Sequence, residues 1–190
     1  MRINKFISLN TAYSRRKADQ LIEEGRVKLN GEILKKLGTN IDIEKDEIEI
    51  DNKKIEKNSE KKYLALNKPM GYITTRNDEL NRKTVMELIP EIDNLKPVGR
   101  LDKDTEGLLL FSNDGDFINQ LTHPKFECEK EYHVEIKGAL TNSNKKKLED
   151  GIFLEGKKTI RSKIKILKIN KEETILIITI KEGRKRQIRK

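Results

Sequence analysis

The apolar residues near the N-terminus recur at helical spacing. Ile3, Phe6 and Ile7 fall on one face of a short helix. Ser14 then stands as a helix N-cap before the run RRKADQLIEE, and Gly25 follows where that helix would stop. The pattern therefore predicts a pair of short helices within the first 25 residues.

Strand signals follow the helix pair. Asn30-Gly31 lies between apolar residues in RVKLNGEIL, which is the strongest short-range signal for a β-hairpin. Isoleucines then alternate with polar residues around a charged turn, at Ile41, Ile43, Ile48 and Ile50. Residues 1–55 are predicted to form a small domain of a helix pair and short strands. Residues 56–62 are almost wholly polar and are predicted to form a linker.

The hydrophobic pattern changes after residue 62. The run YLALNKPMGYITT predicts two strands separated at Lys68-Pro69. Thr84 and Glu87 have the spacing of a capping box for a helix. The run from Leu108 to Phe111 is short and apolar enough for a buried strand, and a helix capped by Asp116 is predicted after a turn at Asn113 to Gly115.

The last third of the chain is richest in strand signals. Tyr132, Val134 and Ile136 alternate on one strand face, and further strands are predicted at Ile160–Ile169 and Thr174–Ile180. A polar helix is expected from Thr141 to Asp150, ended by Gly151. Many strands with few, scattered helices indicate an α+β fold, so residues 63–190 are predicted to form a second domain with a mostly antiparallel mixed sheet and flanking helices.

Charge narrows the class of partner. The chain of 190 residues has a formal net charge of +9 and a pI near 9.4, which favours a polyanion, because cations that neutralise phosphates release counterions. Nucleic acid is preferred to an anionic membrane, since the sequence has no apolar run of membrane-spanning length and no signal-peptide core. We therefore expect a cytoplasmic, monomeric protein. One cysteine and two histidines give no metal-ligand pattern, so no metal is expected.

Basic residues gather at an unfavourable helix end. Arg15, Arg16 and Lys17 occupy the first turn of the second predicted helix, where the macrodipole disfavours cations. A bound phosphate would meet both the free backbone N–H groups and these side chains. Arg26 and Lys28 on the next strand could extend the patch. We interpret the cluster as a contact for RNA or DNA rather than a merely solvated group of charges.

Asp102 lies at the entrance to a core strand, in GRLDKDTEGLLLFSNDG. A carboxylate there would tend to protonate unless a cation kept it ionised, and residues 182–190, EGRKRQIRK, offer several cations. An ionised, partly buried aspartate suits a nucleophile or a general base. The alternative is an ordinary turn-forming or capping aspartate.

Two resemblances unite these features. The runs RINKFIS and SRRKADQLIEEGRVKLNG, with the Ile-rich hairpin after them, resemble the RNA-binding module shared with the fourth protein of the small ribosomal subunit. Four later runs resemble, in content and order, the RsuA/RluB branch of the ribosomal RNA pseudouridine synthases: ALNKPMGYITT, GRLDKDTEGLLLFSNDGD, EKEYHVEI and EGRKRQIR. The resemblance covers nearly the whole chain and implies a pseudouridine synthase fold for residues 63–190.

The resemblance also implies roles for individual residues. Asp102 matches the catalytic aspartate, which promotes cleavage of the uridine N-glycosidic bond either by attacking the sugar or by taking a proton from it. Tyr132 matches a tyrosine that can stack on a flipped base. Arg189 matches the basic partner of the aspartate. Arg100 is expected to hold the target nucleotide out of its helix, and Lys68 and Arg186 are expected to support RNA binding.

The expected function is therefore site-specific isomerisation of uridine to pseudouridine in ribosomal RNA, with a preference for large-subunit over small-subunit RNA. The reaction is redox-neutral and intramolecular, so no cofactor is expected. One alternative is a non-catalytic RNA-binding factor for ribosome assembly. A methyltransferase is the other, and it is disfavoured because no Gly-rich nucleotide-binding loop follows a strand.

The family continues past the RQIR motif with a helix and a further strand, whereas this sequence ends at Lys190. The second domain is accordingly expected to be truncated at its C-terminal end. We expect the 190-residue form to keep its RNA-binding module but to turn substrate over poorly.

Overall fold

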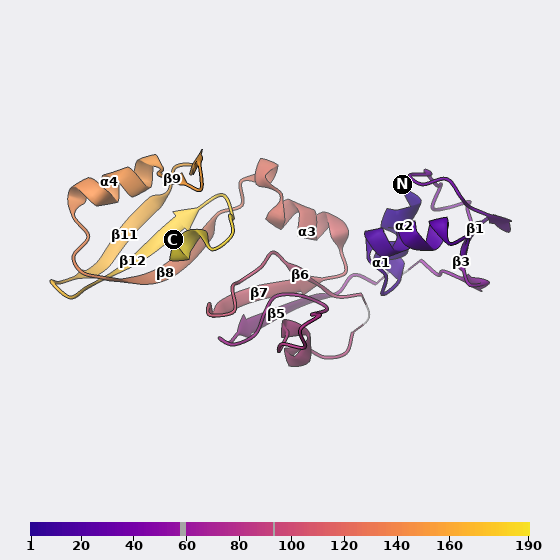
Figure 1. The fold of residues 1–190 in the computed structure, drawn as a ribbon, viewed down its shortest axis with the longest axis horizontal. Coiled ribbons are helices and arrows are strands. Elements are labelled where there is room, and N and C mark those ends of the chain that lie inside the picture. Colours follow the sequence, from indigo (N-terminus) through magenta and orange to yellow (C-terminus); the bar gives the residue numbers. More distant parts are fainter. Residues whose placement is uncertain (58–59, 93) are drawn as a thin grey trace. The chain divides into compact units, whose positions relative to one another are not determined.

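The structure, a computed structural model, describes residues 1–57, 60–92 and 94–190. Its contacts divide the chain into two compact units, Met1–Ile118 and Asn119–Lys190, each of which is described by itself (Figure 1). Residues 58 and 59 of the predicted linker lie outside the described residues. The predicted domain limits at residues 55 and 63 stay predictions.

The first unit begins with the predicted helix pair. Helix α1 spans Ile3–Asn10 and α2 spans Arg15–Glu23. The Ser14 hydroxyl accepts a hydrogen bond from the Lys17 amide at 3.1 Å, which confirms the predicted N-cap. Gly25 follows α2 with a φ of 69°, a left-handed conformation that glycine adopts without strain.

A small antiparallel sheet completes residues 1–55, here called the N-terminal module. Strands β1 (Val27–Leu29), β2 (Glu32–Ile33), β3 (Ile48–Ile50) and β4 (Lys53–Lys54) lie in the order β2-β1-β3-β4. Asn30 and Gly31 both have positive φ, as the predicted two-residue hairpin requires. The predicted alternation at Ile41 and Ile43 forms no strand, because the Ile41 amide donates to the Met1 carbonyl instead.

A second sheet occupies the rest of the first unit. Strands β5 (Tyr63–Lys68), β7 (Gly107–Ser112) and β6 (Lys96–Val98) pair antiparallel in the order β5-β7-β6. The 3-10 helix η1 (Val85–Leu88) covers the apolar face of this sheet, and its core consists of Val85, Leu95, Leu109 and Phe111. The Thr84 amide donates to Glu87 Oε1 at 2.6 Å, so the predicted cap is present on a shorter helix.

Two sequence predictions are wrong, one for residues 70–75 beside this sheet and one for the cap of the helix after it. Residues 70–75 form no strand, because the Gly71 amide and the Thr74 hydroxyl bind the carbonyls of Lys103 and Leu101 rather than a neighbouring strand. Helix α3 spans Gly115–Thr122, and its cap is Asp114, not Asp116. The reason is that Asp114 Oδ1 accepts from the amides of residues 116 and 117.

The second unit is an antiparallel sheet with a helix beside it. Strands β8 (Lys130–Lys137), β12 (Glu173–Ile180) and β11 (Lys163–Ile169) lie in the order β11-β12-β8. Helix α4 (Asn142–Asp150) packs through Leu148 onto their apolar core and lies alongside β11 in Figure 1. Thr141, predicted as the first residue of the helix, is its N-cap, and Gly151 ends the helix as predicted.

Short elements complete the second unit: η2 (Pro124–Phe126), η3 (Gln187–Arg189) and the hairpin of β9 (Phe153–Leu154) and β10 (Lys157–Lys158). The sequence did not predict this hairpin. Strand β11 also starts later than predicted, because the Ile160 amide donates to Glu182 Oε1. All named strands pair antiparallel, so the predicted α+β class is confirmed. Among the described residues, no helix has the length and apolarity needed to cross a bilayer.

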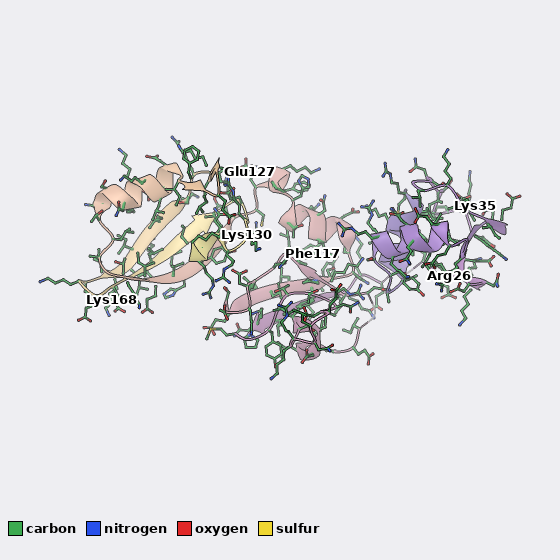
Figure 2. The ribbon with its side chains drawn as sticks, in the orientation of Figure 1. Arg26, Lys35, Phe117, Glu127, Lys130 and Lys168 are labelled. Carbon is green, nitrogen blue, oxygen red and sulfur yellow. The ribbon has the colours of Figure 1, made fainter. Side chains whose placement is uncertain are left out.

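Asp114 joins α3 to the sheet. Besides capping the helix, its Oδ2 accepts from the Tyr63 hydroxyl at 2.9 Å and lies 2.8 Å from Lys61 Nζ. The Tyr63 ring in turn meets the Phe117 ring edge to face, with the ring centroids 5.0 Å apart. Phe117 is labelled in Figure 2. The Lys61 hydrogen bond, helped by the Phe117 amide and the Tyr63 hydroxyl, lowers the pKa of Asp114 to about 2.

We predict that Asp114 makes stability depend on acid pH. Because its folded pKa lies below the unfolded value, the carboxylate contributes above about pH 4, and this contribution is lost as pH falls towards 2. Asp114→Asn keeps a capping oxygen but removes the charge, and should lower the free energy of unfolding by about 1–2 kcal/mol at pH 7. Urea unfolding followed by circular dichroism should show this difference shrinking between pH 4 and 2. A difference that does not change with pH would contradict the assignment.

Candidate active site and RNA-binding residues

The Lys68 side chain is the buried centre of the candidate active site. Lys68 ends β5, and none of its surface is exposed. Its Nζ donates to the carbonyls of Thr105 at 2.7 Å, Pro69 at 3.0 Å and Asp102 at 3.1 Å, with the Lys103 carbonyl at 3.4 Å. An ammonium has three N–H donors, so the three shorter bonds use them all. The lysine therefore gathers the backbone of residues 99–107, here called the aspartate loop.

Burial sets the electrostatics of this lysine. Desolvation lowers the pKa of Lys68, while the charges of Asp104 and Asp102 act in the opposite direction. A buried ammonium is costly unless it is fully hydrogen-bonded, and the surrounding carbonyls meet that requirement. Lys68 therefore holds the aspartate loop and exposes no surface to an RNA phosphate. Its expected support of RNA binding stays a prediction.

A second set of bonds holds the opposite side of the aspartate loop. The buried Thr74 hydroxyl donates to the Leu101 carbonyl at 2.7 Å and accepts from the Leu101 amide at 3.2 Å. The Gly71 amide donates to the Lys103 carbonyl at 2.8 Å. The Leu101 side chain packs against the core of the sheet. The residues on both sides of Asp102 are thus fixed by hydrogen bonds to residues 68–74.

Asp102 itself begins a tight turn. Its carbonyl accepts from the Thr105 amide at 3.1 Å as well as from Lys68. Gly107, with a φ of 123°, then leads the chain into β7. Asp102 is half-buried, and Arg100 two residues earlier is exposed. The backbone of Asp102 thus forms the turn.

The other predicted catalytic residues belong to the second unit. Tyr132 lies on β8 opposite Ile178 of β12 and is half-buried. Arg189 lies in η3 and is exposed, as is Arg186 just before it. Because the two units are described separately, the meeting of Asp102 with Tyr132 and Arg189 stays a prediction.

The C-terminal motif is an ordered network that the sequence did not reveal. Glu182 accepts from Arg184 Nε at 3.0 Å through one oxygen and from Gln187 Nε2 at 2.8 Å through the other. Arg184 also donates to the carbonyls of Lys157 and Lys158 in the β9–β10 hairpin. Arg184, one of the five cations in this run, is therefore structural, and it helps to fix the backbone from which Arg186 and Arg189 extend. The Glu-x-Arg-x-x-Gln spacing was the available signal.

The predicted basic patch at α2 is present at its first turn. Arg15 and Arg16 are exposed at the N-terminal end of the helix, although Arg15 Nη2 donates to Asn4 Oδ1 at 3.4 Å. Lys17 is half-buried with its Nζ 3.1 Å from Gln20 Oε1. Lys28 is half-buried on β1. Exposed guanidinium groups at a helix N-terminus are suited to contact phosphates.

Arg26 is exposed but ion-paired, so its predicted part in the basic patch stays a prediction. Its guanidinium makes two hydrogen bonds to the Asp51 carboxylate, at 2.8 and 2.6 Å, and a third to Glu24 at 3.1 Å (Arg26 is labelled in Figure 2). The bonds to Asp51 and Glu24 raise the pKa of Arg26, and the Arg26 bond lowers the pKa of Asp51. The Arg26 charge is thus already paired within the module.

Comparisons with known proteins match two separate stretches of the chain. A model of the RNA pseudouridylate synthase family matches residues 62–190, and a model of the S4 domain matches residues 1–48. The chain is 43% identical to the ribosomal large subunit pseudouridine synthase B of Bacillus subtilis, across all of this chain and 78% of that protein. It is 41% identical to an uncharacterized RNA pseudouridine synthase of Aquifex aeolicus, across all of this chain and 77% of that protein.

A solved structure gives the same result. The crystal structure of a pseudouridylate synthase superposes with a TM-score of 0.66 at 32% identity, covering 99% of this chain and 80% of that one. The fold and the site thus define an RNA-modifying isomerase with a separate RNA-binding module. The chain belongs to the RNA pseudouridylate synthase family and carries an N-terminal S4 domain.

We predict that Lys68 affects turnover rather than RNA affinity. Lys68→Met should keep the apolar stem but remove the donors that hold the aspartate loop, and a displaced Asp102 should lower kcat about 100-fold. RNA affinity, measured by filter binding, should stay near that of the wild type because the side chain is buried. Weakened RNA binding with an unchanged kcat would instead support direct contact.

We also predict that Arg15 and Arg16, but not Arg26, contribute to the salt dependence of RNA binding. Replacing Arg15 and Arg16 with alanine should reduce the slope of log K against log salt by about 0.7–0.9 for each phosphate that the protein no longer neutralises. The charge-neutral control Arg26→Gln/Asp51→Asn should leave the slope unchanged. A slope that falls in Arg26→Gln/Asp51→Asn but not when Arg15 and Arg16 are replaced would show that Arg26 contacts phosphate despite its pairing with Asp51.

Proposed function

We propose that this enzyme converts specific uridines of ribosomal RNA to pseudouridine, with large-subunit RNA as the substrate and Asp102 as the catalytic carboxylate. The hydrogen-bonded aspartate loop carries the proposal, because it fixes the backbone on both sides of one half-buried carboxylate. The name of the Bacillus subtilis relative, at 43% identity across the whole chain, supports the choice of large-subunit RNA.

The reaction breaks the bond between N1 of uracil and C1′ of ribose and forms a bond from C5 of uracil to the same carbon. No electrons are gained or lost overall, and the hydrogen on C5 moves to N1. Asp102 either attacks the sugar or removes a proton from it, and both routes need the carboxylate ionised. Tyr132 would stack on the uracil once it is flipped, and Arg189 would hold the Asp102 carboxylate in its ionised form.

The N-terminal module supplies the second part of the proposed recognition. Base flipping costs a few kcal/mol, so the enzyme needs binding energy away from the target uridine. Arg15 and Arg16 would provide this binding energy by contacting RNA phosphates. Such contacts fix the position of the protein on the RNA but do not depend on the base sequence. Ribosomal RNA as the substrate would place the enzyme in the cytoplasm.

The direct test of the proposal is Asp102→Asn, assayed for pseudouridine on an unmodified transcript of large-subunit ribosomal RNA. The rate should fall at least about 100-fold, the low end of what a positioned acid–base group contributes. RNA affinity should be retained. Glu106→Gln is a matched control, because it removes another carboxylate from an exposed position of the same loop.

Undiminished activity of Asp102→Asn would discard the catalytic assignment. Tight RNA binding by the wild type with no pseudouridine formed would favour the non-catalytic assembly factor.

A further inference from the structure

The two apolar cores of the first unit share no residue. The core of the N-terminal module consists of residues up to Ile55, and the core of the second sheet begins at Leu64. A pocket of about 170 Å³ lies between them, lined by residues of α1, such as Lys5 and Leu9, and by Asn113 and Asp116 near the start of α3. Because the buried apolar clusters of the described residues do not join the two parts, the orientation of the parts depends on a few specific contacts.

Lys96 makes the best-formed of these contacts. It opens β6, its side chain is half-buried, and its Nζ donates to the Ser8 carbonyl at 2.6 Å. Ser8 lies in the last turn of α1, where backbone carbonyls lack partners within the helix. Within the module, the Thr11 hydroxyl donates to the neighbouring Ile7 carbonyl at 2.7 Å. Lys96 gives the Ser8 carbonyl a donor that comes from outside the module.

The charge of Lys96 suits this position. The C-terminal end of a helix carries partial negative charge, which attracts a cation. Burial lowers the pKa of Lys96, and the nearby charge of Arg76 lowers it further, so the ammonium needs a favourable partner. In the described structure that partner is the end of α1.

Other contacts cross the same boundary. Gly115, the first residue of α3, approaches α1 so closely that a Cβ there would lie 3.0 Å from Leu9 Cδ2. Lys5 Nζ lies 3.5 Å from Asp116 Oδ1, in an exposed pair. Outside the module, the Asn113 side chain bonds the Glu60 carbonyl and the Lys62 amide, which ties the chain entering β5 to the turn before α3.

We propose that Lys96 is a positioning residue that caps α1 and thereby fixes the N-terminal module against the β5-β7-β6 sheet. The distance between phosphates bound at Arg15 and Arg16 and the uridine at Asp102 is then set by this contact. The inference rests on the proposed function, because it assigns the RNA contacts and the reacting uridine to those residues. Lys96 therefore selects which uridines of a structured RNA reach Asp102.

The first test measures the docking without any RNA. Spin labels at exposed positions 36, in the module, and 91, beside the sheet, would be attached to cysteines in a Cys128→Ser background. Double electron–electron resonance should give one narrow distance distribution with Lys96 present and a broad one with Lys96→Met. The control Lys45→Met removes an exposed charge from the same module and should leave the distribution narrow. A broad distribution with Lys96 intact, or no change in Lys96→Met, would overturn the proposal.

The second test measures site selection on an unmodified transcript of large-subunit ribosomal RNA, with pseudouridine mapped at each position. Lys96→Met should raise KM for the preferred uridine about tenfold. If the module is held less firmly, RNA bound at Arg15 and Arg16 presents its uridine to Asp102 at a lower effective concentration. The variant should leave kcat at saturating RNA unchanged and lower the preference for that uridine over others. A fall in kcat with KM and preference unchanged would refute a positioning role.

Asp116→Lys provides a second variant if Lys96→Met does not fold. This substitution replaces the partner of exposed Lys5 with a second cation. It should broaden the distance distribution and raise KM, in both cases less than Lys96→Met does. Unchanged values for this variant in both assays would count against the docking. If the wild type forms no pseudouridine, the proposed function fails, yet the distance measurement still decides whether Lys96 holds the module.

Discussion

One buried ammonium determines the shape of the candidate active site. Lys68 has no exposed surface, and its three N–H donors are used on the carbonyls of Pro69, Asp102 and Thr105. Without that charge, the Asp102 carbonyl would keep only its bond from the Thr105 amide, and the Pro69 and Thr105 carbonyls would lose their Lys68 donor. A buried polar group left unpaired costs about 1–3 kcal/mol. The conformation of the loop that carries Asp102 thus depends on a residue whose own side chain is buried.

Short sequence motifs were enough to predict the elements whose hydrogen bonds join residues close together in the chain. Ser14 caps α2 because its hydroxyl needs only an amide three residues away, and Asn30-Gly31 forms a hairpin because both residues tolerate positive φ. Residues 70–75 look like a strand but form none, since their amide and hydroxyl groups bind a loop about 30 residues further along. Ile41 fails for the same reason, because its amide pairs with the first residue of the chain.

For the candidate site too, the sequence located individual residues but not their tertiary contacts. The resemblance to pseudouridine synthases located Asp102, and the structure shows how its loop is held. The sequence identified cations but not their partners: Arg26 is paired with Asp51, 25 residues away, and Arg184 is bound to backbone carbonyls of a hairpin that was not predicted. Pairings of this kind depend on tertiary contacts, so a count of charges overstates the surface available to RNA. Arg15 and Arg16 remain exposed at the start of α2.

The most direct test of the central claim is amide hydrogen exchange in the aspartate loop, compared between the wild type and Lys68→Met. In the wild type, the Gly71 and Thr105 amides should be protected, because they donate to the Lys103 and Asp102 carbonyls, which lie 3.4 and 3.1 Å from Lys68 Nζ. In Lys68→Met their protection should disappear, while the amides in the middle of β7, the central strand of the sheet, stay protected. Equal protection of the loop amides in both proteins would show that the loop holds its shape without the buried ammonium, and would contradict the account.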